Sequence, residues 1–355
     1  MNSDNVKILN THSLIENLSR TLLYEGYSLF PYHRAAIKNQ KPFPIGVIFP
    51  EDYNAGNPHA NSLMQAQCVF KGDDKPSINI SVRFLHLNKI EISESKDQLE
   101  TDGDRFIPVH NLEVNDKTFV SGWLATEQQI NTEELYVSEL LNGMREFSFK
   151  FNEKIEHEEI KDQEGLVAGR RSSRTHSING IIFIEVSKVY GDQNFFIVTI
   201  RVFNKTKLEN PDSISRDEAL LQSFLSTHMV LSTNNGQFIS TQNPAEEWKN
   251  IISETENINT WPVLIDENNT TMLSSPIIIY DYPKINPLSR GDLFDSTEIE
   301  EALLLHVSVL SDEEKKRIAQ SDDKLEAMLK KVSQVTPREM INLHGGLKEI
   351  TNKEI

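Results

Sequence analysis

Cysteine is nearly absent from this chain of 355 residues, in which Cys68 is the only one. A single thiol excludes an intramolecular disulfide and any zinc or iron–sulfur site built from several thiolates, as is typical of proteins from a reducing compartment. The sequence also lacks an apolar run close to the roughly 20 residues of a membrane span, and its first residues lack the pattern of a signal peptide. These absences predict a soluble cytoplasmic protein without a membrane span.

Positive charge is also scarce. The chain contains 36 Lys and Arg residues against 53 Asp and Glu residues, which gives a formal net charge of −17. Such an excess of carboxylates disfavours non-specific binding to nucleic acids and to anionic membranes. We therefore expect no nucleic-acid partner, and we expect the partners to be neutral, basic or small.

The motifs that would identify a reaction are missing as well. Walker, dinucleotide-binding, HExxH and GxSxG patterns do not occur, and these patterns mark the commonest nucleotide, zinc-protease and hydrolase sites. Cys68 lies on the apolar face of an alternating run, where a thiol is inert. His228 has no partner that the sequence identifies for acid–base chemistry. The sequence therefore predicts no catalytic residue and no cofactor, and an enzyme is the minority interpretation.

What the chain does contain is a strong pattern of strands. Alternating runs predict strands at 45–49, 64–70 and 78–86, and two β-rich runs at 181–189 and 195–203 predict an antiparallel hairpin. The turn sequence Asn234-Asn235-Gly236 predicts a second hairpin between residues 227 and 240. The predicted fold class is α+β, mostly antiparallel β in sandwich-like sheets, with short helices and a helical C-terminal tail.

Capping signals locate the helices and suggest a division into domains. Serine followed by glutamate three residues later predicts a helix at 14–24 and another from Ser215 to about Leu225, and similar signals predict helices in the tail. The length is sufficient for two domains. The predicted units are an N-terminal α+β domain (1–135), a β-sandwich-like domain that carries an acidic loop (136–310) and a helical tail (311–355).

A tyrosine-rich segment follows the first helix. Two interpretations stay open: a docking surface with aromatic anchors and cations, which are enriched at interfaces, and core packing with the tyrosine hydroxyls at the rim, which is favoured. The residues concerned are Tyr24, Tyr27, Tyr32, Arg34 and Lys38.

The stretch from Ser275 to Glu301 combines the most apolar short run with the densest acidic cluster. Pro276–Tyr280 (PIIIY) predicts a buried strand. Six carboxylates follow it between residues 281 and 301, including Asp281, Asp292, Asp295 and Glu298. The spacing of the last three permits a helix cap, an acidic partner-binding surface, or oxygen ligands for Mg²⁺ or Ca²⁺, in decreasing order of expectation.

A short basic run interrupts the acidic sequence at residues 169–176, reading GRRSSRTH. Arginine presents a rigid fork of donors that suits phosphate or a carboxylate-rich partner. Since no strand-to-helix glycine loop surrounds the run, a solvated loop is the favoured interpretation.

Several motifs together resemble one known family. The matching segments are LLYEGYSLFPYHRAAIKN (22–39), REFSF (145–149), SRDEALLQSFLSTHMVL (215–231), NTWPVL (259–264), TMLSSPIIIYDYP (271–283), GDLFDSTEIEE (291–301) and LSDEEK (310–315). They are similar to an uncharacterised bacterial family, mainly actinobacterial, that is associated with gene clusters of nickel–iron uptake hydrogenases. The family pattern has an arginine directly after the third tyrosine, whereas here His33 precedes Arg34.

This resemblance implies a non-catalytic accessory or maturation protein that acts by protein–protein contact, with a hydrogenase subunit or maturation factor as its partner. The alternative is a metal-dependent hydrolase or ligand-binding protein that uses the acidic loop 281–301.

Overall fold

Antiparallel β-sheet dominates the part of the chain that the computed structural model describes. The described residues are 15–24, 44–57, 59–96, 105–189 and 194–283, together with positions 311, 312, 315 and 330. The prediction of a mostly antiparallel β fold with short helices is confirmed. The predicted helical tail lies outside the described residues except at those last four positions, of which 312, 315 and 330 are helical.

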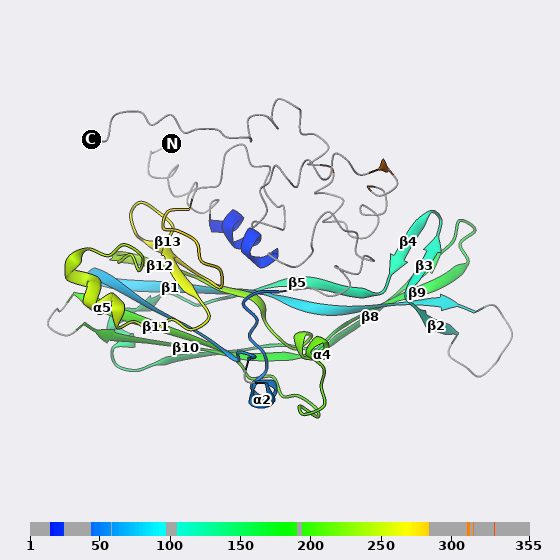
Figure 1. Ribbon diagram of the computed structural model, residues 1–355, viewed down its shortest axis with the longest axis horizontal. Coiled ribbons are helices and arrows are strands. Elements are labelled where there is room, and N and C mark those ends of the chain that lie inside the picture. Colours follow the sequence, from blue (N-terminus) through cyan, green and yellow to red (C-terminus); the bar gives the residue numbers. More distant parts are fainter. Residues whose placement is uncertain are drawn as a thin grey trace.

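The main sheet folds over on itself into two layers, so that β12 and β13 lie above β10 and β11 (Figure 1). Its central path has the order β13-β14-β12-β1-β11-β10-β7, and neighbouring strands are antiparallel. The bounds along this path are β13 (Trp261–Leu264), β14 (Thr271–Ser275), β12 (Leu225–Phe238), β1 (Leu63–Ser95), β11 (Phe195–Asn204), β10 (Ile178–Lys188) and β7 (Arg145–Phe151).

Strand β1 joins the two layers. Residues 63–71 pair with β11, residues 70–72 and 77–85 pair with β12, and the register shifts between Gly72 and Ser77. A Cβ atom on Gly72 would lie 2.7 Å from Cγ of Pro76, so glycine permits the close approach of Pro76 at this irregularity. The strands predicted at 64–70 and 78–86 are therefore two halves of one long strand.

The space between the layers is filled by the inward face of each strand. The prediction that Cys68 points inward is confirmed, and burial raises the pKa of its thiol to about 12, which keeps the thiol protonated and inert. The buried core includes Met64, Ala66, Cys68, Phe70, Ile78, Ile80, Val82, Phe84, Ile182, Ile184, Val198, Ile200, Val202, Met229 and Leu231.

Beyond the sandwich, the second half of β1 continues into an arm of strands that extends to one side (Figure 1). The end of β1 pairs with β5 and β2 along one edge and with β9 along the other, and β8 pairs with β9. A small apolar cluster around Ile90, Ile92, Val114 and Ile160 stabilises the arm. The strands are β2 (Phe106–Val109), β3 (Asn111–Val114), β4 (Lys117–Val120), β5 (Gly122–Asn131), β8 (Lys154–Lys161) and β9 (Val167–Thr175).

Two predictions about loops and turns are wrong. The basic run at 169–176 is not a solvated loop, because all but its last residue belong to β9, between β1 and β8. Few side chains of the arm are buried, so its strands carry polar residues on both faces and lack the alternation that identifies a strand. The second hairpin is also wrong, because β12 continues through Asn235 and Gly236. The irregularity lies in β1 opposite them, between Gly72 and Ser77.

The hairpin predicted from the two most β-rich runs is confirmed as β10 and β11. The two strands pair along their whole length, from Gly180 opposite Asn204 to Lys188 opposite Phe196. The backbone N–H of Val189 donates to the carbonyl of Phe195 at 2.9 Å where the strands meet the connecting link.

Helices are few and short among the described residues. The predicted first helix is present over residues 15–24. The predicted capping box of Ser215 and Glu218 is also present: the N–H of Glu218 donates to Oγ of Ser215 at 3.2 Å, and the N–H of Ser215 donates to Oε2 of Glu218 at 3.0 Å. The remaining short elements are α2 (Glu51–Gly56), β6 (Leu135–Tyr136), α3 (Val137–Leu140), α4 (Arg216–Leu220), η2 (Glu246–Trp248) and α5 (Lys249–Ser253).

The main sheet contains strands from both predicted domains, because β1 pairs with β5 and also with β11 and β12. The boundaries at residues 135 and 310 stay predictions. Over the described ranges, no helix is long and apolar enough to cross a membrane.

Candidate functional site

The outer face of the upper layer is covered by two segments that are far apart in the sequence. The helix at 15–24 lies on this face (Figure 1), and the chain that follows β14 packs against the same cluster. Leucine and isoleucine side chains from the helix, from β12–β14 and from residues 277 and 279 meet there. The cluster consists of Leu22, Val230, Val263, Ile265 and Leu273, with Ile15, Leu18, Ile277 and Ile279 packed against it.

A charged contact fixes the helix to β1. The guanidinium of Arg83 donates to both carboxylate oxygens of Glu16, at 3.0 and 2.6 Å. His228 lies opposite Arg83 on β12 and is fully buried, and burial lowers the pKa of its imidazole to about 4. The imidazole is therefore neutral at physiological pH, with Nδ1 3.1 Å from the carbonyl oxygen of Ser226.

Tyr24, the first of the predicted docking tyrosines, is the last described residue of this helix and is buried. Its hydroxyl donates to Glu127 of β5 at 2.6 Å. The arrangement is that of a core tyrosine with its hydroxyl at the rim, one of the two interpretations left open for this segment. Tyr27, Tyr32, Arg34 and Lys38 lie outside the described residues.

The run PIIIY at 276–280 is not a buried strand, so this prediction is wrong. Strand β14 ends at Ser275, residues 276 and 277 form a bend, and residues 278–280 have no regular secondary structure. The side chains of the run alternate between the apolar cluster and solvent. Ile277 and Ile279 pack on the cluster, while Ile278 is 67% exposed and Tyr280 is 83% exposed. Proline at 276 has no N–H for a sheet ladder, which favours the end of pairing there.

Asp281 anchors the end of this run. Its carboxylate accepts hydrogen bonds from the hydroxyl of Ser240 at 2.5 Å and from the backbone N–H of Leu264 at 2.8 Å. The next residue, Tyr282, donates its backbone N–H to the carbonyl of Leu264 at 2.7 Å. One oxygen of Asp281 thus holds the segment to β13, and the other holds it to Ser240, just after β12. Asp292, Asp295 and Glu298 lie outside the described residues.

Four large side chains are exposed along this β13 edge, and we refer to them as the edge patch. Trp261 begins β13 and is 44% exposed, and Tyr282, whose backbone bonds to Leu264 at the other end of β13, is 40% exposed. Ile278 and Tyr280 complete the edge patch. Aromatic and aliphatic side chains that gather on a surface are typical of protein–protein contacts.

The edge patch and the tyrosine-rich segment begin on the same face of the molecule. Leu22 lies in the apolar cluster two residues before Tyr24, and Ile279 packs on that cluster two residues before Asp281. The sequence could not relate these two candidate regions, because Tyr24 and Tyr280 are 256 positions apart in the sequence. In the structure, the helix at 15–24, which leads into the tyrosine-rich segment, shares its apolar cluster with Ile277 and Ile279 beside the edge patch.

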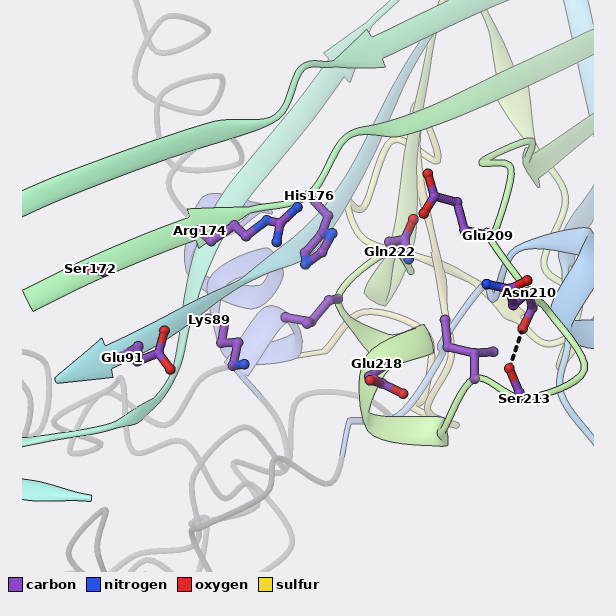
Figure 2. A pocket seen from close by; sticks show the side chains of 12 residues that line it. Lys89, Glu91, Ser172, Arg174, His176, Glu209, Asn210, Ser213, Glu218 and Gln222 are labelled. Atoms are coloured by element: carbon purple, nitrogen blue, oxygen red, sulfur yellow. Dashed lines mark hydrogen bonds between the residues drawn. The ribbon is translucent and has the colours of Figure 1, made fainter. Parts of the chain in front are cut away.

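A pocket of about 490 Å³ lies where the arm meets α4 (Figure 2). Helix α4 lies on the side of the sheet opposite the helix at 15–24 (Figure 1). One wall comes from β1, β9 and His176, and the opposite wall comes from residues 209–214 and from α4 with the two residues that follow it. The lining residues are Lys89, Glu91, Ser172, Arg174, His176, Glu209, Asn210, Ser213, Ile214, Glu218, Leu221 and Gln222.

The strand wall of the pocket concentrates nitrogen-bearing side chains. Lys89 lies directly opposite Arg174 in the β1–β9 register, so the two side chains share a face. Burial lowers the pKa of His176 below its usual value. The charge of Arg174 lowers this pKa further, and the charge of Lys89 has the same effect. The imidazole of His176 is therefore neutral near pH 7.

The pocket residues differ in how well the sequence predicted them. Ser172, Arg174 and His176 belong to the basic run for which phosphate or carboxylate binding was the less favoured of two interpretations. Lys89 and Glu209 carried no signal, because only the tertiary fold brings β1 opposite the 209–214 loop. Within the described part of the chain, no three His, Cys, Asp or Glu side chains are grouped to hold a metal ion.

No protein-family model matches this chain, and no curated protein matches it. The resemblance to the hydrogenase-associated family therefore stays a prediction.

Proposed function

We propose that this protein is a non-catalytic accessory or maturation protein of a nickel–iron hydrogenase system, and that it acts in the cytoplasm by protein–protein contact through the edge patch. The exposure of Ile278 and Tyr280 supports this proposal most directly. These two side chains belong to the most apolar short run of the chain, and they remain 67% and 83% exposed although their neighbours are packed.

The way the run is held also supports a docking surface. Asp281 and Gln242 fix its backbone: the carbonyl of Ile279 accepts from the amide of Gln242, and the N–H of Asp281 donates to the same side chain at 3.1 Å. Ile278 and Tyr280 are thus displayed on a fixed backbone. A fixed surface loses little conformational entropy on binding, which favours affinity.

The charge of the chain favours a basic partner. The net charge is −17, and the acidic stretch up to residue 301 continues directly from the edge patch in the sequence. Opposite charge on a partner would increase the association rate and select among partners. We therefore expect a hydrogenase subunit or maturation factor with a basic rim around an apolar depression.

Affinity purification tests the proposal in cells that express the neighbouring hydrogenase. We expect the tagged protein to retain a hydrogenase subunit or maturation factor, and we expect deletion of its gene to lower hydrogen uptake. If neither retention nor a change in uptake is observed, the proposal is wrong.

The alternative is a metal-dependent hydrolase or ligand-binding protein that uses the loop 281–301. Both oxygens of Asp281 already accept hydrogen bonds, so ligation of a metal by this residue would disrupt the anchor of the run. Calorimetric titration of Mg²⁺, Ca²⁺, Mn²⁺ and Ni²⁺ into the wild type and an Asp292→Asn/Asp295→Asn variant separates the alternatives. A metal-dependent heat that the variant loses would favour the metal site.

A further inference from the structure

The pocket between the arm and α4 offers unpaired charges of both signs. Arg174 is already neutralised, because its guanidinium contacts Oε1 of Glu153 at 2.7 and 2.8 Å. The ammonium of Lys89, by contrast, forms no hydrogen bond or ion pair within the ranges that the structure describes. One cation on the strand wall is therefore available to a ligand.

Across the pocket, the loop wall offers a carboxylate. Glu218 accepts hydrogen bonds from Ser215 in the capping box, and these bonds lower the pKa of its carboxyl. The charge of Lys89 acts in the same direction, although the two groups form no ion pair. Glu209 forms no hydrogen bond or ion pair to any described residue. Figure 2 shows Lys89 and Glu209 on opposite walls, with His176 between them at the end of β9. Ile214 and Leu221 add apolar surface to the same wall as Glu209.

We propose that this pocket binds a small zwitterion, namely an α-amino acid or a short peptide with free ends. Its carboxylate contacts Lys89 and the imidazole of His176, and its ammonium contacts Glu209. A volume of about 490 Å³ lies within the range of roughly 300–1,000 Å³ that small-molecule pockets occupy. The proposal is independent of the protein contact at the edge patch, which lies on the other side of the sheet.

A simple anion is a poorer match for these walls. Glu91, Glu209 and Glu218 also line the pocket, and three carboxylates oppose a ligand that carries only negative charge. A simple cation would in turn leave the ammonium of Lys89 without a partner. A ligand with both charges can pair with the ammonium of Lys89 on one wall and with the carboxylate of Glu209 on the other.

Calorimetric titration of the full chain tests the proposal with defined probes: L-alanine, alanylalanine, trialanine, the same peptides with acetylated or amidated ends, and inorganic phosphate. We expect saturable binding of at least one uncapped probe, and we expect capping of either end to weaken it by about tenfold or more. Binding of alanine alone identifies an amino-acid site, and tighter binding of a peptide identifies a peptide site.

Charge-removing variants assign the contacts. Lys89→Met and Glu209→Gln should each weaken the uncapped probe by about tenfold, whereas Lys188→Met and Glu164→Gln, which alter exposed charges outside the pocket lining, should leave it unchanged. Binding of capped and uncapped probes with equal affinity would overturn the proposal, and this comparison needs no variant. Absence of binding by every uncapped probe, or phosphate binding that Glu209→Gln strengthens, would overturn it as well.

Discussion

Arg83 and Glu16 form a two-point ion pair that ties the first helix to the centre of the sheet. Nη1 and Nη2 of Arg83 lie 3.0 and 2.6 Å from the two carboxylate oxygens of Glu16. Arg83 is almost buried, whereas Glu16 is about half exposed. The helix thereby shields a strand guanidinium and also covers the apolar face that the run after β14 shares.

Removal of Glu16 should therefore destabilise the protein. Glu16→Ala leaves an almost buried guanidinium without its carboxylate, and we expect the free energy of unfolding to fall by about 1–2 kcal/mol. Urea unfolding of the variant measures this change. The matched control is Glu139→Ala, which removes an exposed partner 3.2 Å from Arg145 and should cost less than about 0.5 kcal/mol. Equal losses of unfolding free energy in the two variants would show that the Glu16–Arg83 ion pair stabilises the protein no more than an exposed ion pair does.

Gly46 is expected to be essential for the position of the run at 276–280. It has a φ of +57°, and a Cβ there would lie 2.5 Å from Cβ of Pro276. Gly46→Ala should cost about 2–3 kcal/mol, the sum of left-handed backbone strain and displacement of the proline. Gly165→Ala is the control, because Gly165 has a φ of +82° with open space around it, and it should cost only about 1 kcal/mol. Thermal unfolding of both variants gives the comparison.

His86 should make the stability of the protein depend on pH. Its side chain is buried, and neither ring nitrogen forms a hydrogen bond of good geometry in the described part of the chain. Burial lowers its pKa from 6.5 to about 4 and outweighs the opposite effect of the backbone of Leu221 and His176. The folded state holds the neutral imidazole, so protonation favours the unfolded state. The contribution of His86 to the free energy of unfolding is therefore complete above pH 6.5 and is lost as the pH falls from 6.5 towards 4. At pH 5 the loss is about 2 kcal/mol.

His86→Leu should reduce this pH dependence in urea unfolding measured at pH 7.5 and pH 5. His110→Leu, which changes an exposed histidine, should leave it as in the wild type. An unchanged difference between the two pH values in His86→Leu would contradict the assignment.

The predictions that succeeded depended on neighbours in the sequence. The β10–β11 hairpin and the capping box of Ser215 and Glu218 are each encoded by residues that lie within one local segment. The first helix is predicted by its capping signal and its leucine spacing in the same way. Local patterns of this kind predict the same local structure whatever the tertiary contacts are.

The predictions that failed depended on tertiary context. PIIIY has the composition of a buried strand, yet residues 276–280 form no sheet pairing with any described strand, and the side chains of Ile278 and Tyr280 face solvent. The basic run became β9 because the end of β1 provides an edge for it. The pocket is formed by segments from residue 89 to residue 222, and no local pattern encodes that proximity.

The capping box should also shape the pocket wall. Ser215→Ala removes a hydroxyl that accepts from the N–H of Glu218, and we expect a loss of about 1 kcal/mol in the free energy of unfolding. The same change should weaken binding of the zwitterionic probe, because Glu218 and Leu221 belong to that wall. Ser215→Asn keeps a capping oxygen and serves as the control. Wild-type values for both quantities in Ser215→Ala would contradict this prediction.

The central claim is that the protein binds its partner through the edge patch. The most direct test compares the removal of exposed apolar side chains at the edge patch and elsewhere. The first variant is Ile278→Ser/Tyr280→Ser in the edge patch, and the second is Leu166→Ser, which removes a side chain that is 63% exposed next to β9 in the arm. Both variants change only exposed side chains, so both should unfold at the wild-type temperature. The measurement is the amount of hydrogenase subunit or maturation factor that each tagged protein retains. The account predicts a loss of about tenfold or more in the double variant and wild-type retention in Leu166→Ser. Equal retention by the wild type and the double variant would contradict it.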